Sequence, residues 1–280
     1  MKLYELNQQI SQILSEAGIT EADLEAFYIL EHVLNISRSS YFLRKAEEVS
    51  QEVCNSCIEI AKERSGHRPL QYILGTQEFM GLNFYVNENV LIPRQDTEGL
   101  VEQVLALTKG TERVLDLCTG SGCIGISLKK HKSSLQVTAA DISTKALKVA
   151  EKNAKALEAD ITFLESDLFD KITGTFDFIV SNPPYIKSDV IPTLMPEVRD
   201  NEPLLALDGK EDGLYFYRRI VQESKGYLNP DGMLCLEIGY DQGSAVAELM
   251  KAQGFIQVRV EQDLCGLDRN VYGKIGGNHV

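Results

Sequence analysis

The sequence predicts an α/β protein in which a doubly wound sheet follows a small N-terminal bundle of helices. The first observation is the apolar spacing of residues 3–74, which is helical throughout. The second is a change at Arg113, after which short apolar runs alternate with helical segments to the end of the chain. The third is a glycine-rich turn directly after the first of these runs, where such sheets usually bind ligands.

Length and composition exclude several classes of protein. With 280 residues, 44% of them hydrophobic, the chain can bury one large core and a smaller one, which excludes a disordered or fibrous protein. Asp and Glu outnumber Lys and Arg by 41 to 28, and the net charge of -13 repels a nucleic-acid backbone. No apolar run approaches the ~18 residues of a membrane helix, and six scattered cysteines form no metal-binding set. We therefore expect a reduced, cytoplasmic protein that acts on a protein or small molecule, without a metal and without direct contact to nucleic acid or membrane.

The N-terminal part predicts three main helices. The first ends near Gly18, a residue type that suits the position after a helix. Thr20 and Asp23 have the spacing of a capping box and predict the start of the second helix. Ser50 precedes the third helix and Gly66 follows it. Because apolar residues recur at helical spacing in each segment, we expect the helices to bury one face in a small bundle.

Two cysteines, Cys54 and Cys57, lie on the apolar stripe of the third helix. A Cys-x-x-Cys pair can also serve redox or metal chemistry, but neither a second pair nor a preceding strand accompanies this one. We therefore expect both thiols to pack in the core of the bundle.

Residues 75–92 form the expected boundary between the bundle and the sheet. Aromatic and branched residues replace the helical pattern there, and Gly81 is placed for a tight turn, which predicts a linking β-hairpin. Beyond it, Asp96 or Thr97 can cap a helix that runs to about Leu107. The three expected parts are a helical domain at residues 1–74, a hairpin linker at 75–92 and a larger domain at 93–280.

The larger domain is expected to alternate between strands and helices. The strands are expected at residues 113–117, 136–140, 161–164, 176–180, 233–238, 256–261 and 270–275. The helices are expected from Gly122, at residues 143–157, at about 213–225 and in a segment that ends at 253. Residues 276–280 are expected to form a loose end.

The turn after the first strand is a candidate binding site for a nucleoside cofactor. It contains Cys118, Thr119, Gly120, Ser121 and Gly122, and its glycines allow a ligand to approach the backbone at a helix N-terminus. Its G-x-G-x-x-G pattern fits both nicotinamide cofactors and S-adenosylmethionine, so the motif alone does not separate them. Asp141 ends the second strand, 21 residues after Gly120, where its carboxylate can accept hydrogen bonds from both ribose hydroxyls. The alternative is a glycine turn that serves only tight packing of strand and helix.

The segment Asn182, Pro183, Pro184 and Tyr185 follows an apolar run that reads as a buried parallel strand. Two prolines prevent a helix or an inner ladder there and leave carbonyls free. The Asn182 side chain beside such carbonyls can hold a planar NH2 group by both hydrogens, with Tyr185 as a wall. The segment therefore predicts a site for an amino or amide nitrogen, and the alternative is a proline-rich turn.

A third candidate, Asp167, Leu168 and Phe169, follows the third strand. Asp167 can accept from an adenine amino group, and the two apolar residues can cover its ring. The alternative is a capped turn with a core Phe. All three candidate segments lie at the carboxyl ends of parallel strands, where open sheets of this kind bind ligands.

Nine segments carry a resemblance to a known family. They are residues 68–75 (RPLQYILG), 91–98 (LIPRQDTE), 114–122 (VLDLCTGSG), 140–143 (ADIS), 166–169 (SDLF), 179–186 (IVSNPPYI), 197–200 (EVRD), 205–208 (LALD) and 236–239 (LEIG). Over about residues 65 to 275 the chain resembles the release factor glutamine methyltransferases, the PrmC/HemK family. The Asn-Pro-Pro-Tyr motif is shared with amino-methylating DNA and RNA enzymes, whereas the linker segments 68–75 and 91–98 and the stretch 197–208 are much more specific.

The resemblance implies a Rossmann-like S-adenosylmethionine-dependent methyltransferase sheet joined by a β-hairpin linker to an N-terminal helical bundle. The implied enzyme methylates the amide nitrogen of the glutamine in the Gly-Gly-Gln motif of peptide-chain release factors, giving N5-methylglutamine. Asn182 and the Pro183 carbonyl would accept the two N–H bonds of the amide, Tyr185 would pack against its plane, and the helical domain would bind the release factor.

Two residues depart from the family pattern, and two other functions stay open. Cys118 and Lys210 stand where the family usually has glycine, and we expect an ordinary backbone conformation at Cys118. The first alternative function is a nucleobase amino-methyltransferase acting on DNA or RNA, which the net charge disfavours. The second is a cofactor-binding protein without catalysis, which the intact segment from Asn182 to Tyr185 disfavours.

Overall fold

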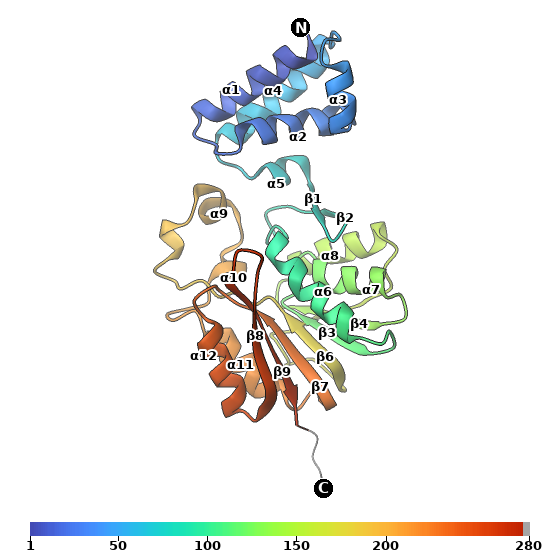
Figure 1. The fold of residues 1–280 in the computed structure, drawn as a ribbon, viewed down its shortest axis with the longest axis vertical. Helices are drawn as coiled ribbons and strands as arrows, with labels where there is room; N and C mark the ends of the chain where they lie inside the picture. Colours follow the sequence, from blue (N-terminus) through green and yellow to red (C-terminus); the bar gives the residue numbers. More distant parts are fainter. Residues whose placement is uncertain (277–280) are drawn as a thin grey trace. The chain divides into compact units, whose positions relative to one another are not determined.

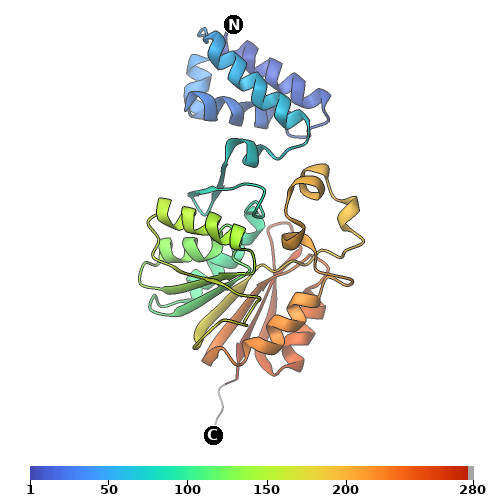
Figure 2. The same cartoon turned by 180° about the vertical axis from the view of Figure 1, so that it is seen from behind.

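The structure of the protein is a computed structural model that describes residues 1–276, and it divides into two compact units (Figures 1 and 2). Met1–Gly75 and Met195–Asn201 make up the first, here called the helical unit. Thr76–Leu194 and the chain from Glu202 onward make up the second, here called the sheet unit. The loose end expected at 276–280 lies, apart from residue 276, outside the described residues.

The helical unit is built from six helices in its described residues. They are α1 (Leu3–Glu16), α2 (Ala22–Leu34), α3 (Arg38–Arg44), α4 (Gln51–Ser65), α5 (Leu70–Leu74) and the distant α9 (Pro196–Asn201). The helices from α1 to α4 bury one face each in a common core, or in the case of α3 pack Tyr41 against it. Cys54 and Cys57 are both buried there, which confirms that they are core residues.

The two expected helix starts in this unit have different outcomes. The Ser50 hydroxyl accepts a hydrogen bond from the Val53 amide, so the expected cap of α4 is confirmed. The capping box at Thr20 and Asp23 is wrong, because α2 begins after Glu21 without a side-chain cap. The Asp23 carboxylate instead accepts a hydrogen bond from the Ser11 hydroxyl on α1, at 2.5 Å, so a contact between helices replaces the local one.

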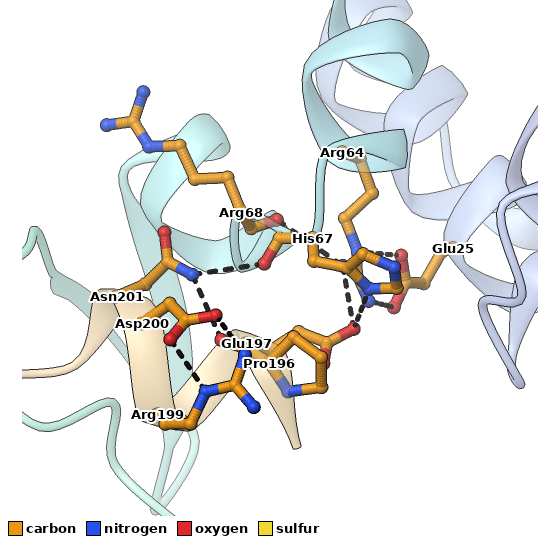
Figure 3. A network of polar contacts seen from close by, with 9 residues as sticks. All are labelled: Glu25, Arg64, His67, Arg68, Pro196, Glu197, Arg199, Asp200 and Asn201. Carbon is orange, nitrogen blue, oxygen red and sulfur yellow. Dashed lines mark hydrogen bonds and ion pairs between the residues drawn. The ribbon is translucent and has the colours of Figure 1, made fainter. Parts of the chain in front are cut away.

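Helix α9 belongs to the helical unit although about 120 residues separate it from α5. Figure 3 shows the polar contacts of this segment. Arg64, only 5% exposed, makes an ion pair with Glu25 at 2.7 Å and another with Glu197 of α9 at 3.1 Å. The His67 ring contacts Glu197 at 3.1 Å, and the Asn201 amide donates to the His67 carbonyl at 3.2 Å. We call Glu25, Arg64, His67 and Glu197 the Arg64 cluster.

The sheet unit begins with the expected hairpin, in which β1 (Thr76–Phe79) pairs antiparallel with β2 (Leu82–Tyr85). Gly81 lies in the turn with φ of +70°. A short 3-10 turn, η1 (Gln95–Thr97), leads into α6 (Glu98–Leu107). The helix is where the sequence predicts it, but neither Asp96 nor Thr97 caps it. The Thr97 hydroxyl is buried and instead accepts from the Asn182 amide at 3.3 Å.

Seven strands form one sheet in the order β5-β4-β3-β6-β7-β9-β8. Their bounds are β3 (Arg113–Leu117), β4 (Gln136–Asp141), β5 (Thr162–Glu165), β6 (Phe176–Ser181), β7 (Leu228–Glu237), β8 (Phe255–Gln262) and β9 (Asp268–Ile275). The five strands from β5 to β7 are parallel, and β9 runs antiparallel to both of its neighbours. Strand β7 starts earlier than expected, because the turn-like residues 229–232 form an irregular extension paired at Leu228 with Phe176.

Helices cover both faces of the sheet, as Figures 1 and 2 show, so the doubly wound prediction is confirmed. One face carries α6, α7 (Cys123–His131) and α8 (Thr144–Ala156), and the other carries α11 (Tyr215–Ser224) and α12 (Gly243–Ala252). Side chains alternate along the central strand: Val114 packs in the core under α6 and α7, while Leu115 packs in the core under α11 and α12. The sequence analysis named none of the short elements α3, α5, η1, η2 (Ile191–Thr193), α9 and α10 (Leu204–Leu207).

Candidate active site

A cavity of about 300 Å³ opens at the carboxyl ends of β3, β4, β5 and β6, within the sheet unit. Nine of the candidate residues line it: Cys118, Thr119, Gly120, Ser121, Asp141, Asp167, Leu168, Asn182 and Pro184. Four others, Gly122, Phe169, Pro183 and Tyr185, do not line it. The three candidate segments therefore meet at one place, and the structure sorts their residues into lining and supporting positions.

Asp116, near the end of β3, holds the glycine turn through hydrogen bonds. Its carboxylate accepts hydrogen bonds from the Thr119 hydroxyl at 2.6 Å and from the Gly125 amide at 2.9 Å. Burial raises the pKa of Asp116 to about 7 despite these two bonds. Gly122 has φ of +82°, and a Cβ there would meet Ile126 and Ala150, so this glycine serves helix packing.

The ordinary backbone conformation expected at Cys118 is wrong, because this residue has a positive φ of +57°. The Thr119 amide donates to the Ala140 carbonyl at 3.0 Å, so the ladder between β3 and β4 continues past the turn and fixes the backbone there. A left-handed conformation costs a residue with a Cβ about 1–2 kcal/mol. Lys210, the other departure from the family pattern, also has a positive φ, of +71°. Both positions thus have the conformation that favours glycine.

Asp141 links the glycine turn to the start of α8. One carboxylate oxygen accepts from the Gly120 amide at 2.9 Å and the other from the Ser143 amide at 2.8 Å. The cap of α8 is Ser143, whose hydroxyl accepts from the Ala146 amide, so Asp141 is not itself the capping residue. Burial raises the pKa of Asp141 above its ordinary value. Each oxygen keeps a free lone pair for a ligand hydroxyl.

The three residues of the third candidate segment have different positions, because two of them line the cavity and the third lies in the core. Asp167 and Leu168 line the cavity, and the Asp167 carboxylate pairs with Arg219 at 2.9 Å. Phe169 is a core residue, 1% exposed, with its ring stacked on Tyr227 at a centroid distance of 4.7 Å. The structure thus gives Phe169 the core position that the sequence left as an alternative, and the apolar surface of the cavity comes from Leu168 instead.

The segment after β6 presents Asn182 and Pro184 to the cavity. The Ser181 hydroxyl donates to the Leu117 carbonyl at 2.8 Å and ties the end of β6 to β3. The sequence led us to expect the Tyr185 ring as a wall of the site. The ring instead packs against the core under α11 and does not line the cavity. Among the described residues, none donates a hydrogen bond to the Pro183 carbonyl.

Sequence analysis did not single out three polar residues at this site. Arg94 lines the cavity and pairs with the buried Glu202. Glu237, at the end of β7, is 1% exposed, and burial raises its pKa to about 7. The sequence does carry a signal for Glu237, because it is a charged residue at the carboxyl end of an otherwise apolar strand.

The residues present fit a nucleoside cofactor. The missing side chain of Gly120 leaves open space, so a ligand can approach the backbone, and Asp141 supplies acceptors beside it. Residues 1–276 contain no cluster of three or more His, Cys, Asp or Glu side chains able to hold a metal ion. In the same range, none of the helices has the length and apolar character needed to cross a membrane.

Comparison with known proteins gives two matching family descriptions, "PrmC N-terminal domain" over residues 5–75 and "Methyltransferase small domain" over residues 95–196. A protein of Geobacter sulfurreducens named "Release factor glutamine methyltransferase" is 42% identical over 264 residues, which are 94% of this chain and 93% of the relative. A protein of the same name from Streptococcus pneumoniae is 39% identical over 274 residues, 97% of this chain and 98% of the relative.

Two solved structures share the fold over most of the chain. A methyltransferase from Pyrococcus furiosus matches with a TM-score of 0.54 at 17% identity, over 70% of this chain and 90% of that one. The catalytic domain of hMettl16, solved with an RNA hairpin, matches with a TM-score of 0.58 at 17% identity, over 79% and 83% of the two chains. At such low identity these likenesses show the methyltransferase fold and nothing of the substrate.

Proposed function

Because the chain belongs to the release factor glutamine methyltransferase family, we propose that it transfers a methyl group from S-adenosylmethionine to the side-chain amide nitrogen of a glutamine in a peptide-chain release factor. The observation that carries this proposal is the 42% identity to one such relative across 94% of the chain, which includes both units. The target is the glutamine of the Gly-Gly-Gln motif, the product is N5-methylglutamine, and the reaction takes place in the cytoplasm.

The glycine turn and Asp141 hold the cofactor in this proposal. The backbone at Gly120 lies against the ligand, the Asp141 carboxylate accepts from the ribose hydroxyls, and Asp167 with Leu168 borders the adenine. When bound, S-adenosylmethionine supplies an electrophilic methyl group on its sulfonium. The assignment is supported by the fact that Gly120, Asp141, Asp167 and Leu168 all line the same cavity.

Asn182 and Pro183 hold the glutamine amide. The Asn182 side-chain oxygen and the Pro183 carbonyl accept its two N–H bonds, and Pro184 forms an apolar wall beside it. An amide nitrogen is a poor nucleophile because its lone pair is delocalised, so fixed orientation must supply much of the rate. The same two acceptors favour the positive charge that develops on the nitrogen, and its proton then leaves to water.

The two parts of the chain have separate roles in this proposal. Residues 1–74 recognise the release factor, residues 75–92 link, and residues 93–280 bind the cofactor and carry out the transfer. The cavity lining supports a separate role for residues 1–74, because all of it lies in the sheet unit, although Asn89, Val90 and Leu91 of the linker also contribute to it. One glutamine among many must be selected through surfaces remote from the reacting nitrogen, and a separate helical unit offers such a surface.

Mass spectrometry tests the function directly. Release factor incubated with the protein and S-adenosylmethionine should gain one methyl group, and fragmentation should place it on the glutamine of the Gly-Gly-Gln motif. A release factor with that glutamine changed to asparagine is the matched control and should stay unmodified. Methylation of DNA or RNA in place of the release factor would establish the nucleobase alternative and contradict the proposal.

A further inference from the structure

Glu237 and Asn182 are neighbours across two parallel strands. Strands β6 and β7 pair with Ser181 opposite Leu236, so the next residues, Asn182 and Glu237, lie side by side at the carboxyl ends of these strands. Side chains at paired positions point to the same face of a sheet. Thr97, on the segment η1 that leads into α6, lines the cavity beside Asn182.

The three side chains form a buried polar chain. The Asn182 amide nitrogen donates to the Thr97 hydroxyl at 3.3 Å, and hydrogen bonds from Thr97 and Asn182 act on the Glu237 carboxylate. Thr97 is 3% exposed and Glu237 1%. The second carboxylate oxygen, Oε2, is buried and has no hydrogen-bond partner within the described part of the chain. A buried carboxylate with an unsatisfied oxygen lowers the stability of the fold, so stability does not explain why Glu237 is there.

No cation neutralises this carboxylate. Arg269 on β9 attracts it, but the ion pairs of Arg269 are made to Asp263 at 3.0 Å and to Asp96 at 3.3 Å. Within residues 1–276, Glu237 takes part in no ion pair. Among the described residues, the side chains that hydrogen-bond to the Glu237 carboxylate are those of Thr97 and Asn182.

A carboxylate at this place decides which way the Asn182 amide faces. An ionised carboxylate only accepts hydrogen bonds, so the Thr97 hydroxyl must donate to it and is left to accept from Asn182. Only the NH2 end of the Asn182 amide can donate. The oxygen, Oδ1, is thereby directed away from Thr97 and Glu237.

We propose that Glu237 is a positioning residue for methyl transfer, which acts directly and through Thr97 to hold the Asn182 side chain with its oxygen toward the glutamine nitrogen. This inference rests on the proposed function. It explains why a charged side chain is buried behind the site without touching the substrate. A glutamine at the same place could donate as well as accept, and would let the amide adopt either orientation.

The first test is Glu237→Gln, which keeps the shape of the side chain and removes its charge. In single turnover with cofactor and release factor saturating, we expect methyl transfer to slow by about 10- to 100-fold. KM for both substrates should be unchanged, because neither touches Glu237. Tyr217→Phe is the matched control, since the Tyr217 hydroxyl donates to the backbone carbonyl of Glu237 at 2.9 Å and leaves the carboxylate alone. This control should lower the melting temperature and keep the wild-type rate.

A second variant pair keeps the inference testable if Glu237→Gln fails to fold. Thr97→Val removes the hydroxyl that connects Glu237 to Asn182, and it should slow methyl transfer in the same way. Thr97→Ser restores the hydroxyl and should restore the rate. Equal rates for the valine and serine variants would overturn the proposal.

The pH profile distinguishes positioning from a merely structural role. A protonated Glu237 can donate, so the wild-type single-turnover rate should fall as the pH drops below about 7, and Glu237→Gln should lose this dependence. The other titratable or charged groups that interact with Glu237 are Asp96, Arg269, Tyr185, Tyr217, Cys123 and Tyr272. Burial raises the pKa of the three tyrosines and of Cys123, so these four stay neutral throughout the experiment.

A double-mutant cycle separates this inference from the proposed function. If Glu237 acts only through Asn182, the variant carrying both Asn182→Ala and Glu237→Gln should be no slower than Asn182→Ala alone. A wild-type rate for Glu237→Gln, or additive losses in the cycle, would overturn the positioning role while leaving the function standing. Failure of the wild-type protein to methylate release factor would instead contradict the proposed function itself.

Discussion

Two groups of carboxylates in the molecule differ in whether a cation pairs with them: Glu25 and Glu197 are half-buried and paired, whereas Asp116 and Glu237 are buried and unpaired. In the Arg64 cluster of the helical unit, Glu25 and Glu197 both pair with one buried arginine (Figure 3). Burial alone would raise the pKa of Glu197, but hydrogen bonds from its own backbone, His67 and Arg64 hold it below the ordinary value. At the cavity of the sheet unit, burial without an ion pair raises the pKa of Asp116 and Glu237 to about 7.

The difference separates a structural cluster from a functional one. Removing one partner of a buried ion pair is strongly destabilising, so the pair of Arg64 with Glu197 holds α9 in the helical unit. An unpaired buried carboxylate lowers stability and is retained where its charge or hydrogen bonding serves a site. Whether a cation pairs with a carboxylate therefore indicates its role better than the extent of its burial does.

The largest effect is expected from Arg64→Ala, which leaves the half-buried carboxylates of Glu25 and Glu197 without their buried cation. The helical unit should lose about 3–5 kcal/mol of stability. Denaturant unfolding followed by a probe in residues 1–75 measures this loss, and calorimetry should find cofactor binding unchanged. Arg44→Ala breaks only the exposed pair of Arg44 with Glu47, so this control should change stability by less than about 1 kcal/mol. Similar losses of stability in Arg64→Ala and Arg44→Ala would mean that the Arg64 cluster stabilises the helical unit no more than an exposed ion pair does.

A smaller effect is expected from Asp141→Ala. Losing a charged acceptor for the ribose hydroxyls should weaken S-adenosylmethionine binding by about 1.5–3 kcal/mol, measured by titration calorimetry. Asp160→Ala, at an exposed carboxylate outside the cavity lining, is the control and should bind the cofactor normally. Normal affinity in Asp141→Ala, with only a lower melting temperature, would mean that Asp141 merely ties the glycine turn to α8.

A third effect, which depends on pH, is a gain in stability for Glu237→Gln. The pKa of Glu237 is about 7 when folded and about 4.3 in an unfolded chain, so the folded state binds its proton more tightly. Its charge is therefore destabilising in full above about pH 7, and the penalty disappears as the pH falls toward the unfolded value. The variant should melt higher than wild type at pH 8, and the two should converge near pH 5. A variant that melts lower at pH 8 would mean that the ionised carboxylate stabilises the fold.

Much of the sheet unit follows from sequence pattern alone. Buried parallel strands are short apolar runs, so their alternation with helices predicts the doubly wound sheet, and their carboxyl ends place Gly120, Asp141 and Asn182 together. The roles assigned to these residues stay predictions until the variants are measured. Orientation within a turn is harder to predict, because Leu168 and Phe169 are both apolar and only tertiary packing decides which of them faces the cavity.

Other features depend on contacts that no local pattern records. Glu197 lies 133 residues from Arg64 in the chain, so the sequence gives no signal that α9 belongs to the helical unit. At Cys118 the residue type argues against a positive φ, but the ladder between β3 and β4 imposes one. At Cys118, tertiary structure overrides a correct statement about local preference.

The central claim is that Asn182 orients the nucleophile, and a single-turnover measurement on Asn182→Ala tests it most directly. With both substrates saturating, methyl transfer should slow by at least ~10²-fold, because one of two preorganised acceptors at the reacting nitrogen is lost. Cofactor affinity should stay within a few-fold of wild type, since the glycine turn and Asp141 are untouched. A wild-type rate in the folded variant, with only its melting temperature reduced, would contradict the claim and make Asn182 a turn residue that holds the end of β6.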